Sequence, residues 1–303
     1  MNVLKPNVTK YVGKTVKDVL RDLGLSARVI SRLKNNEQGI LLDGARVTVR
    51  AVIKEGSVLT LNFGDDETSF TPEQQPLTVL YEDEFVAVFD KPAGMHTHPS
   101  KAIQHGTLAN AAVHHFQCRG EKITFRAVNR LDCGTSGAVV CAKDAHSARI
   151  IASSMSKVYL CICHGEIPES GRFDGNIGLA DGSIIKRCVR EDGQTAVTDF
   201  VRIDSGVDCS AAAVLLQTGR THQIRVHFSS AGHPLVGDTL YGSGDDDIAR
   251  QALHCAAVAF ELPNGRRLAA TCAVPDDIER LAKKHNFCLP DDALLNQLLQ
   301  RQK

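Results

Sequence analysis

The segment that decides the fold is a polar loop between two apolar stretches, AVNRLDCGTSGAVVCAKD, residues 127–144. The apolar stretches have the composition of buried β-strands, so we expect a hairpin within a larger sheet. In extended backbone, residues two apart project to the same side, which places Arg130 and Asp132 on one face of the loop. Asn129 and Leu131 then face the other way. Two interpretations stay open: a tight turn that happens to be polar, or an active-site loop that presents an aspartate.

Strands and helices are predicted on both sides of this loop. Their order is irregular, with many strands joined by hairpins and helices inserted at intervals. This order favours an α+β fold with a large mixed or antiparallel sheet and flanking helices, rather than a regular βαβ repeat. Strands are expected within 77–94 (two strands and a turn), 137–143, 157–164, 195–203, 210–218, 254–262 and 267–273, and helices within 106–116, 144–156, 221–231, 275–286 and 291–300.

The composition is that of a globular chain of about two domains. The 303 residues are 43% apolar and 23% charged, which is ordinary for a protein that buries a sizeable core. No apolar run approaches the ~18 residues that a membrane span needs. The first ten residues, MNVLKPNVTK, lack the apolar core of a signal peptide. We therefore expect a cytoplasmic protein without a membrane segment.

Charge is distributed unevenly along the chain. Residues 1–63 hold eleven Lys and Arg against five Asp and Glu, a net charge of +6, so the remainder carries −6 and the total is zero. A basic module attached to an acidic body is suited to holding a polyanion such as RNA. The alternative is a surface that is charged only because it is solvated.

The basic module is expected to contain two short helices followed by a strand hairpin at Asp43-Gly44. The second helix carries Arg28, Arg32 and Lys34 off its apolar stripe, so it can present a basic, RNA-binding face. This order resembles the α-L RNA-binding domain first described in a small-subunit ribosomal protein. We expect this domain at 1–63, a linker at 64–76 because that segment is acidic, polar and Pro-bearing, and a second domain at 77–303.

Metal and cofactor sites are not predicted. The ten cysteines are irregularly spaced without a C-x-x-C pair, and Cys161 and Cys163 lie in an apolar strand, as reduced small hydrophobes do. The twelve histidines are dispersed, and neither His114 with His115 nor His96 with His98 has other ligands at suitable spacing. No glycine-rich phosphate loop is present.

A second polar cluster lies at residues 215–242, LLQTGRTHQIRVHFSSAGHPLVGDTLYG. A strand turns at Gly219 and a helix follows, on which His222 and Arg225 share one face because they are three residues apart. Arg220 stands where the helix dipole disfavours a cation, so we expect it to hold a phosphate or carboxylate. For Arg225 the alternative is that it merely pairs with a nearby acid.

Four blocks of this sequence resemble those of the RluA-type pseudouridine synthase family. They are DKPAGMHTHP, NRLDCGTSG, KVYLCICHG and the block from LQTGRTHQIR to DTLYG, in the family's order, and the match runs from about Leu77 to Pro275. The resemblance implies an enzyme that isomerises uridine in RNA to pseudouridine without metal or cofactor. It also makes 77–303 the catalytic domain, to which many family members join an α-L module.

The resemblance carries site residues with it. Asp132 matches the essential aspartate, which either attacks the anomeric carbon or removes the 2′ hydrogen of the sugar. Tyr159 matches the ring that packs on the uracil and is implicated in deprotonating ring carbon five. Arg225 matches the arginine that pairs with the aspartate, and Arg130 a residue that occupies the space left by the flipped uridine. The substrate-binding set is completed by Leu160, Arg220 and His222.

One position departs from the family pattern, because Asn129 stands where His usually precedes Arg-Leu-Asp. By the alternation above it points away from Asp132, so a supporting polar contact can survive the change.

The substrate implied is large-subunit ribosomal RNA first and tRNA second, and we expect a monomer. Two alternatives remain: a catalytically silent RNA-binding or ribosome-assembly protein, and a hydrolase that uses Asp132 as nucleophile.

Overall fold

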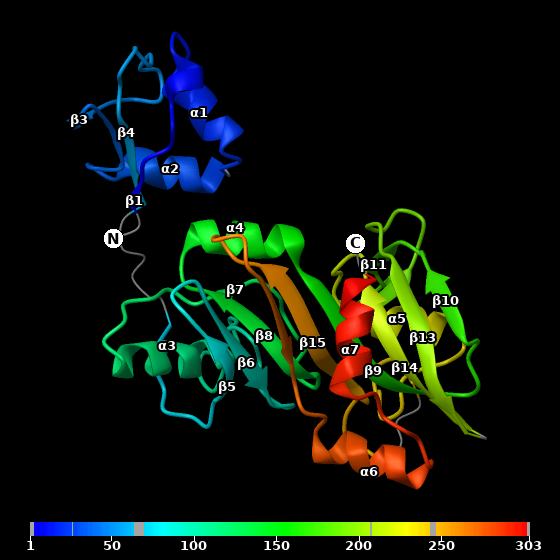
Figure 1. Ribbon diagram of the computed structural model, residues 1–303. Helices are drawn as coiled ribbons and strands as arrows, with labels where there is room; N and C mark the ends of the chain where they lie inside the picture. The colour runs from blue at the N-terminus through cyan, green and yellow to red at the C-terminus, as the bar shows by residue number, and fades with distance from the viewer. Residues whose placement is uncertain (1–2, 26, 64–69, 207, 243–246, 302–303) are drawn as a thin grey trace. The chain divides into compact units, whose positions relative to one another are not determined.

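The fold is described from a computed structural model, which covers residues 3–25, 27–63, 70–206, 208–242 and 247–301. The chain divides into two compact units, Met1–Ser69 with Lys122–Thr124, and Phe70–Glu121 with Phe125–Lys303. Residues 64–69, part of the segment expected to be a linker at 64–76, lie outside the described ranges. Figure 1 shows the elements of each unit.

The first unit pairs two helices with a small antiparallel sheet. Its elements are β1 (Val3–Leu4), η1 (Thr9–Tyr11), α1 (Val16–Asp22), α2 (Ala27–Asn35), β2 (Ile40–Leu42), β3 (Ala45–Arg46) and β4 (Leu59–Asn62), with strand order β1-β4-β2-β3. Thr15 and Asp18 form a capping box at the start of α1. Asp43 and Gly44 have φ of 52° and 81°, the left-handed pair that a two-residue hairpin requires. The predicted order of two helices and a hairpin is confirmed.

The second unit is built on a ten-stranded sheet with the order β10-β13-β14-β9-β15-β8-β6-β5, to which β16 and β7 add beside β15 and β8. The β8–β15 pair is parallel and the other pairs are antiparallel. The predicted α+β fold with a large mixed sheet and flanking helices is therefore confirmed. The strands of this sheet are β5 (Thr78–Glu82), β6 (Val86–Lys91), β7 (Arg126–Ala127), β8 (Ser136–Ala142), β9 (Ser156–His164), β10 (Ser170–Phe173), β13 (Thr198–Ser205), β14 (Cys209–Leu216), β15 (Leu253–Glu261) and β16 (Arg267–Thr271). β11 (Ile177–Leu179) and β12 (Arg187–Val189) pair with each other in a separate two-stranded antiparallel sheet.

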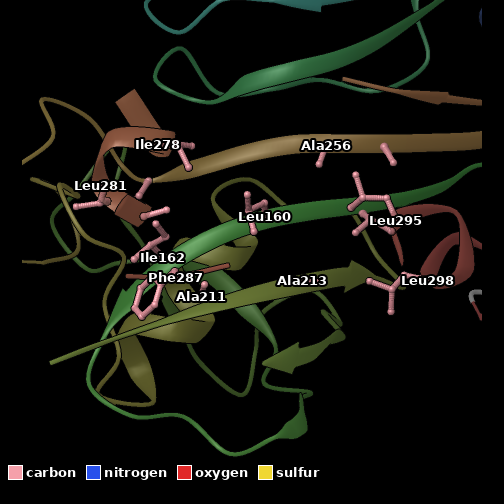
Figure 2. Close-up of a cluster of buried hydrophobic side chains, with 14 of the residues drawn as sticks. Leu160, Ile162, Ala211, Ala213, Ala256, Ile278, Leu281, Phe287, Leu295 and Leu298 are labelled. Carbon is pink, nitrogen blue, oxygen red and sulfur yellow. The ribbon is translucent and has the colours of Figure 1, made fainter. Parts of the chain in front are cut away.

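Helices cover this sheet and close its core. They are α3 (Leu108–Cys118), α4 (Ala145–Ser154), α5 (Gln223–Ser230), α6 (Asp276–Lys284) and α7 (Asp292–Gln300). Figure 2 shows side chains of α6 and α7, among them Ile278 and Leu295, packed against Leu160 of β9 and Ala213 of β14. These side chains are at most 3% exposed, so the C-terminal helices are integral to the fold. In the described part of the chain no helix is long and apolar enough to cross a membrane.

The centre of the sheet brings β8, β15 and β9 side by side. β8 and β15 approach closely at Gly137, which has a φ of 115° and whose missing Cβ would lie 2.3 Å from the carbonyl oxygen of Cys255. Only glycine fits such a contact. The loop that carries Asp132 ends immediately before β8, so this contact fixes the point from which the loop emerges.

Candidate active site

A small pocket lies where the loop before β8, strand β9 and the start of α5 meet. It encloses about 60 Å³ and holds Asp132, Tyr159 and Arg225, which come from three distant parts of the sequence. The other residues that line it are Arg130, Leu131, Thr135, Leu216, Arg220, His222, Gln223, Ile224 and Leu253. Six of the seven residues predicted to be catalytic or substrate-binding therefore share one pocket.

The loop before β8 presents Asp132 as the alternation predicted. Asn129 and Leu131 are each 6% exposed, whereas the Asp132 side chain is 27% exposed and Arg130 is exposed. The Asn129 amide donates to the carbonyl of Ala138 at 2.9 Å and accepts from the amide of Val140 at 2.8 Å. Asn129 thus ties the loop to β8 from the side opposite Asp132.

Arg225 is held more closely by Asp238 than by Asp132. Its Nε and Nη2 donate to the two carboxylate oxygens of Asp238 at 2.7 and 2.8 Å, while its Nη1 lies 3.7 Å from Oδ2 of Asp132. Burial lowers the pKa of Arg225, but Asp238 and then Asp132 raise it above its ordinary value. Arg225 therefore places a positive charge beside Asp132, and its main partner is a nearby acid, Asp238.

His222 approaches the same carboxylate from the start of α5. It has a φ of 58°, and its Nε2 lies 3.8 Å from Oδ2 of Asp132. The hydroxyl of Tyr241 accepts from the amide of Arg187 at 2.8 Å and lies 2.8 Å from Nδ1 of His222. We assign the Tyr241 hydroxyl as the donor and Nδ1 of His222 as the acceptor of this hydrogen bond. The ring hydrogen of the neutral His222 is then on Nε2, which faces Asp132. Burial lowers the pKa of His222, so the ring is neutral at neutral pH.

Tyr159 and Leu160 are neighbours on β9 and point to opposite faces of the sheet. Tyr159 is 5% exposed and lines the pocket. Burial, and then Cys255 and Asp132, raise the pKa of its hydroxyl well above the ordinary value, so it is protonated at neutral pH. Leu160 lies in the core against the C-terminal helices (Figure 2) and is not exposed. Its expected place in the substrate-binding set is wrong, because a strand cannot turn two successive side chains to one pocket.

Lys91 lies behind the Asp132 loop and is completely buried. Its ammonium group donates to the carbonyls of Pro92 and Met95 at 2.9 and 2.7 Å and to that of Cys133 at 3.3 Å. Burial lowers the pKa of Lys91 to about 8. Lys91 thus connects the end of β6 to the residue that follows Asp132.

Three of the four remaining predicted residues are exposed. Arg220 lines the pocket, and its Nε donates to the carbonyl of Thr195 at 2.9 Å. In the first unit Arg32 and Lys34 are exposed on α2, while the side chain of Arg28 lies outside what the structure describes. Across the described residues, no group of three or more His, Cys, Asp or Glu side chains is arranged to hold a metal ion.

Sequence reasoning missed Asp238 and Tyr241, which hold Arg225 and His222 from behind. Both residues lie in the second polar cluster, so the cluster itself was found. The signal that could have found Asp238 is an acid that directly follows an apolar, glycine-containing stretch, LVGD, since an acid in a buried segment is rarely left unpaired.

Comparison with known proteins gives a single family. The family model described as RNA pseudouridylate synthase matches residues 85–230. An uncharacterized RNA pseudouridine synthase of Bacillus subtilis (strain 168) is 38% identical over 281 residues, 90% of this chain and 99% of the relative. The ribosomal large subunit pseudouridine synthase D of Xanthomonas campestris pv. campestris is 33% identical over 267 residues, 80% of this chain and 79% of the relative.

A solved structure shares the fold. Human RNA Pseudouridylate Synthase Domain Containing 1 superimposes with a TM-score of 0.60 at 24% identity, over 76% of this chain and 98% of that one. At this identity the likeness bears on the architecture of the sheet and its helices.

Proposed function

Because the chain belongs to the RNA pseudouridylate synthase family, we propose that it isomerises specific uridines in structured RNA, with Asp132 as the residue that begins the reaction. The observation that carries this proposal is that Asp132, Tyr159 and Arg225 line one pocket. Family membership gives the type of reaction. The pocket supplies the groups that the reaction needs.

The reaction replaces the bond that joins the base to the sugar of the nucleoside. The bond between ring nitrogen N1 and the sugar carbon C1′ breaks, a bond between C5 and C1′ forms, the C5 hydrogen leaves and N1 gains a hydrogen, so that product and substrate are isomers. The Asp132 carboxylate begins this sequence either by attacking C1′ or by removing the 2′ hydrogen. Both routes need the carboxylate to be ionised, and both are open to a side chain that is 27% exposed and lines the pocket.

Arg225 supplies a positive charge beside the carboxylate. Its guanidinium lies 3.7 Å from Asp132, and its own side chain is 9% exposed. The neutral His222 presents an N–H to the same oxygen from 3.8 Å. Both groups therefore lie close to the carboxylate of Asp132, and neither forms a short ion pair with it.

Tyr159 packs on the target uracil in this proposal. Its ring lies along one wall of the pocket, and its hydroxyl is protonated when the base arrives, because burial raises its pKa. A stacked base conceals the atoms that react, so the uridine must leave its helix to enter the pocket. The exposed Arg130, next to Asp132 in the loop, is placed to occupy the space that the base leaves.

The proposed substrate is large-subunit ribosomal RNA, with tRNA as the second candidate. Several relatives 30–33% identical to this chain are named ribosomal large subunit pseudouridine synthase D. The first unit supports binding to structured RNA, because residues 1–63 carry a net charge of +6 and Arg32 and Lys34 are exposed on α2. We propose that this unit is an α-L-type RNA-binding domain.

The test is pseudouridine mapping of total RNA from cells with and without the gene, and from deleted cells that produce wild-type protein or Asp132→Asn. We expect one or a few sites in large-subunit ribosomal RNA to disappear on deletion and to return only with the wild-type protein. Sites that disappear from tRNA instead change the substrate but retain the reaction. An unchanged map, or sites restored by Asp132→Asn, contradicts the proposal and favours a catalytically silent RNA-binding protein.

A further inference from the structure

The residues that follow Asp132 are held by polar contacts from the start of β15. Arg250, three residues before this strand, donates from Nη1 to the carbonyl of Gly134 at 3.0 Å and from Nη2 to the hydroxyl of Ser136 at 3.3 Å. The next residue, Gln251, donates from its amide to the hydroxyl of Thr135 at 3.1 Å. Two loop residues, Gly134 and Thr135, and the first residue of β8, Ser136, are thereby held by two successive residues of another segment.

All three nitrogens of the Arg250 guanidinium donate hydrogen bonds to protein groups. Nη1 also donates to the carbonyls of Gln251 and Leu253 at 3.2 and 3.0 Å. Nε and Nη2 donate to the two carboxylate oxygens of Asp277, in the first turn of α6, at 2.7 and 2.8 Å. The side chain is 10% exposed, so Arg250 has neither a donor nor surface to offer to RNA.

The carboxylate of Asp277 neutralises the largely buried positive charge of Arg250. Burial alone would raise the pKa of Asp277, but the hydrogen bonds and charge of Arg250 lower it below the ordinary value. Asp277 is therefore ionised, and the pair carries no net charge. Because side chains of α6 pack in the core, the pair connects that helix to the loop of Asp132 through the contact of Arg250 with Gly134.

The loop depends on such contacts because it lies outside the strand ladders. Between β7 and β8, residues 128–135 have no regular pairing, and Gly134 packs closely on Gln251, since an added Cβ would lie 2.5 Å from the amide oxygen of Gln251 and would displace that side chain. A displacement of about 1 Å in a reacting group costs on the order of 10²-fold in rate. The position of Asp132 thus rests on residues that never meet the substrate.

We propose that Arg250, with Asp277 as its counter-ion, is a positioning residue that sets the Asp132 loop for the reaction. This inference rests on the proposed role of Asp132. A purely structural residue would lower the amount of folded enzyme. A positioning residue lowers kcat in enzyme that is folded and binds RNA normally.

The experiment compares full-length wild type, Arg250→Ala, Arg250→Lys and Asp277→Asn on an RNA that contains the mapped site. For Arg250→Ala we expect kcat to fall about 10²-fold with KM and RNA affinity within about 3-fold of wild type, since the Arg250 contacts reach only protein groups. Guanidinium chloride at low millimolar concentration should restore part of kcat, whereas the same concentration of NaCl should not. The kcat values of the conservative Arg250→Lys and Asp277→Asn variants should lie between those of wild type and Arg250→Ala. These two variants keep the test usable where Arg250→Ala folds poorly.

The matched control is Arg172→Ala, which removes an arginine that makes the same two-point contact with an acid, Asp199, but is 60% exposed and lies on β10. It should leave kcat unchanged. An unchanged kcat in Arg250→Ala, a rise in KM alone, or a loss of kcat that follows the unfolded fraction and ignores guanidinium overturns the proposal.

Amide hydrogen exchange separates this inference from the proposed function. Arg250→Ala should speed exchange within residues 128–136 while β9 and β14 exchange as in wild type. That result supports the positioning role whatever the enzyme's substrate. Unchanged exchange in 128–136 contradicts it. If wild type makes no pseudouridine on any RNA, the proposed function fails, and the exchange measurement still decides how the loop is held.

Discussion

Asp238 grips the guanidinium of Arg225 through two contacts of 2.7 and 2.8 Å, while the third nitrogen of the same group faces Asp132 at 3.7 Å. Asp238 is itself fixed, because one of its oxygens accepts from the backbone amides of Leu240 and Tyr241. Asp238 therefore fixes the position of the Arg225 guanidinium beside Asp132. A tight ion pair with Asp132 would occupy the carboxylate, and the longer contact leaves it open to the pocket.

Asp238→Asn should destabilise the protein and slow the reaction, because it leaves the charge of Arg225 buried without its main partner. The Asp238 side chain is not exposed and that of Arg225 is 9% exposed, so we expect a loss of about 3 kcal/mol in the free energy of unfolding, measured with urea. Asp199→Asn breaks the exposed pair with Arg172 and should cost under about 1 kcal/mol. Equal losses in the two variants would show that Arg225 does not depend on Asp238.

Tyr159→Phe should separate packing from chemistry at the base. The ring remains, so RNA affinity should stay within a few-fold of wild type, while steps that use the hydroxyl should slow by about 10²-fold, the usual range for a lost acid–base group. Single-turnover rates at saturating RNA measure the chemical step, and filter binding measures affinity. An unchanged single-turnover rate would confine Tyr159 to packing.

Lys91 makes stability depend on pH in the alkaline range. Its pKa is about 8 in the folded protein and about 10.4 in an unfolded chain, so between these values the unfolded chain binds more protons. Stability from this group therefore rises with pH through that window. Between pH 7.5 and 9.5 the wild type should gain about 2 kcal/mol relative to Lys91→Met, measured by urea unfolding.

Lys283→Met is the matched control for that measurement, because Lys283 is 77% exposed. Its free energy of unfolding should run parallel to that of wild type from pH 7.5 to 9.5. If Lys91→Met also runs parallel to wild type, the buried ammonium does not titrate in this range.

The basic face of α2 should contribute to RNA affinity through phosphate contacts. Each such contact adds about 0.7 to the slope of log affinity against log salt on single-stranded RNA, so Arg32→Gln with Lys34→Gln should flatten the slope by about 1.4. The comparison is Lys283→Gln with Lys284→Gln, the same change of charge on α6. A titration at several salt concentrations measures both, and equal slopes for the two double variants would refute the role of α2.

The sequence by itself determined most of the elements and much of the pocket, but not the short strands β7, β10, β11 and β12. Alternating and continuous apolar runs gave the strands, and period-two geometry placed Asn129 and Leu131 inward and Asp132 outward, because side-chain direction along extended backbone is a local property. Helical spacing does not explain why His222 and Arg225 both lie near Asp132, because His222 precedes α5 and has a left-handed backbone with a φ of 58°. The same period-two rule, applied to β9, separates Leu160 from Tyr159 and was available from the sequence.

Only the tertiary structure decided which distant groups meet. Asp238 lies thirteen residues from Arg225, beyond the reach of a helical or strand period, and Arg250 touches Gly134 across more than a hundred residues. Their partners depend on the order of strands in the sheet, which sets β15 between β8 and β9. That order is chosen by the burial of the whole apolar surface. The local sequence pattern therefore predicted the direction of the polar side chains, and the packing of the sheet decided which partner each of them contacts.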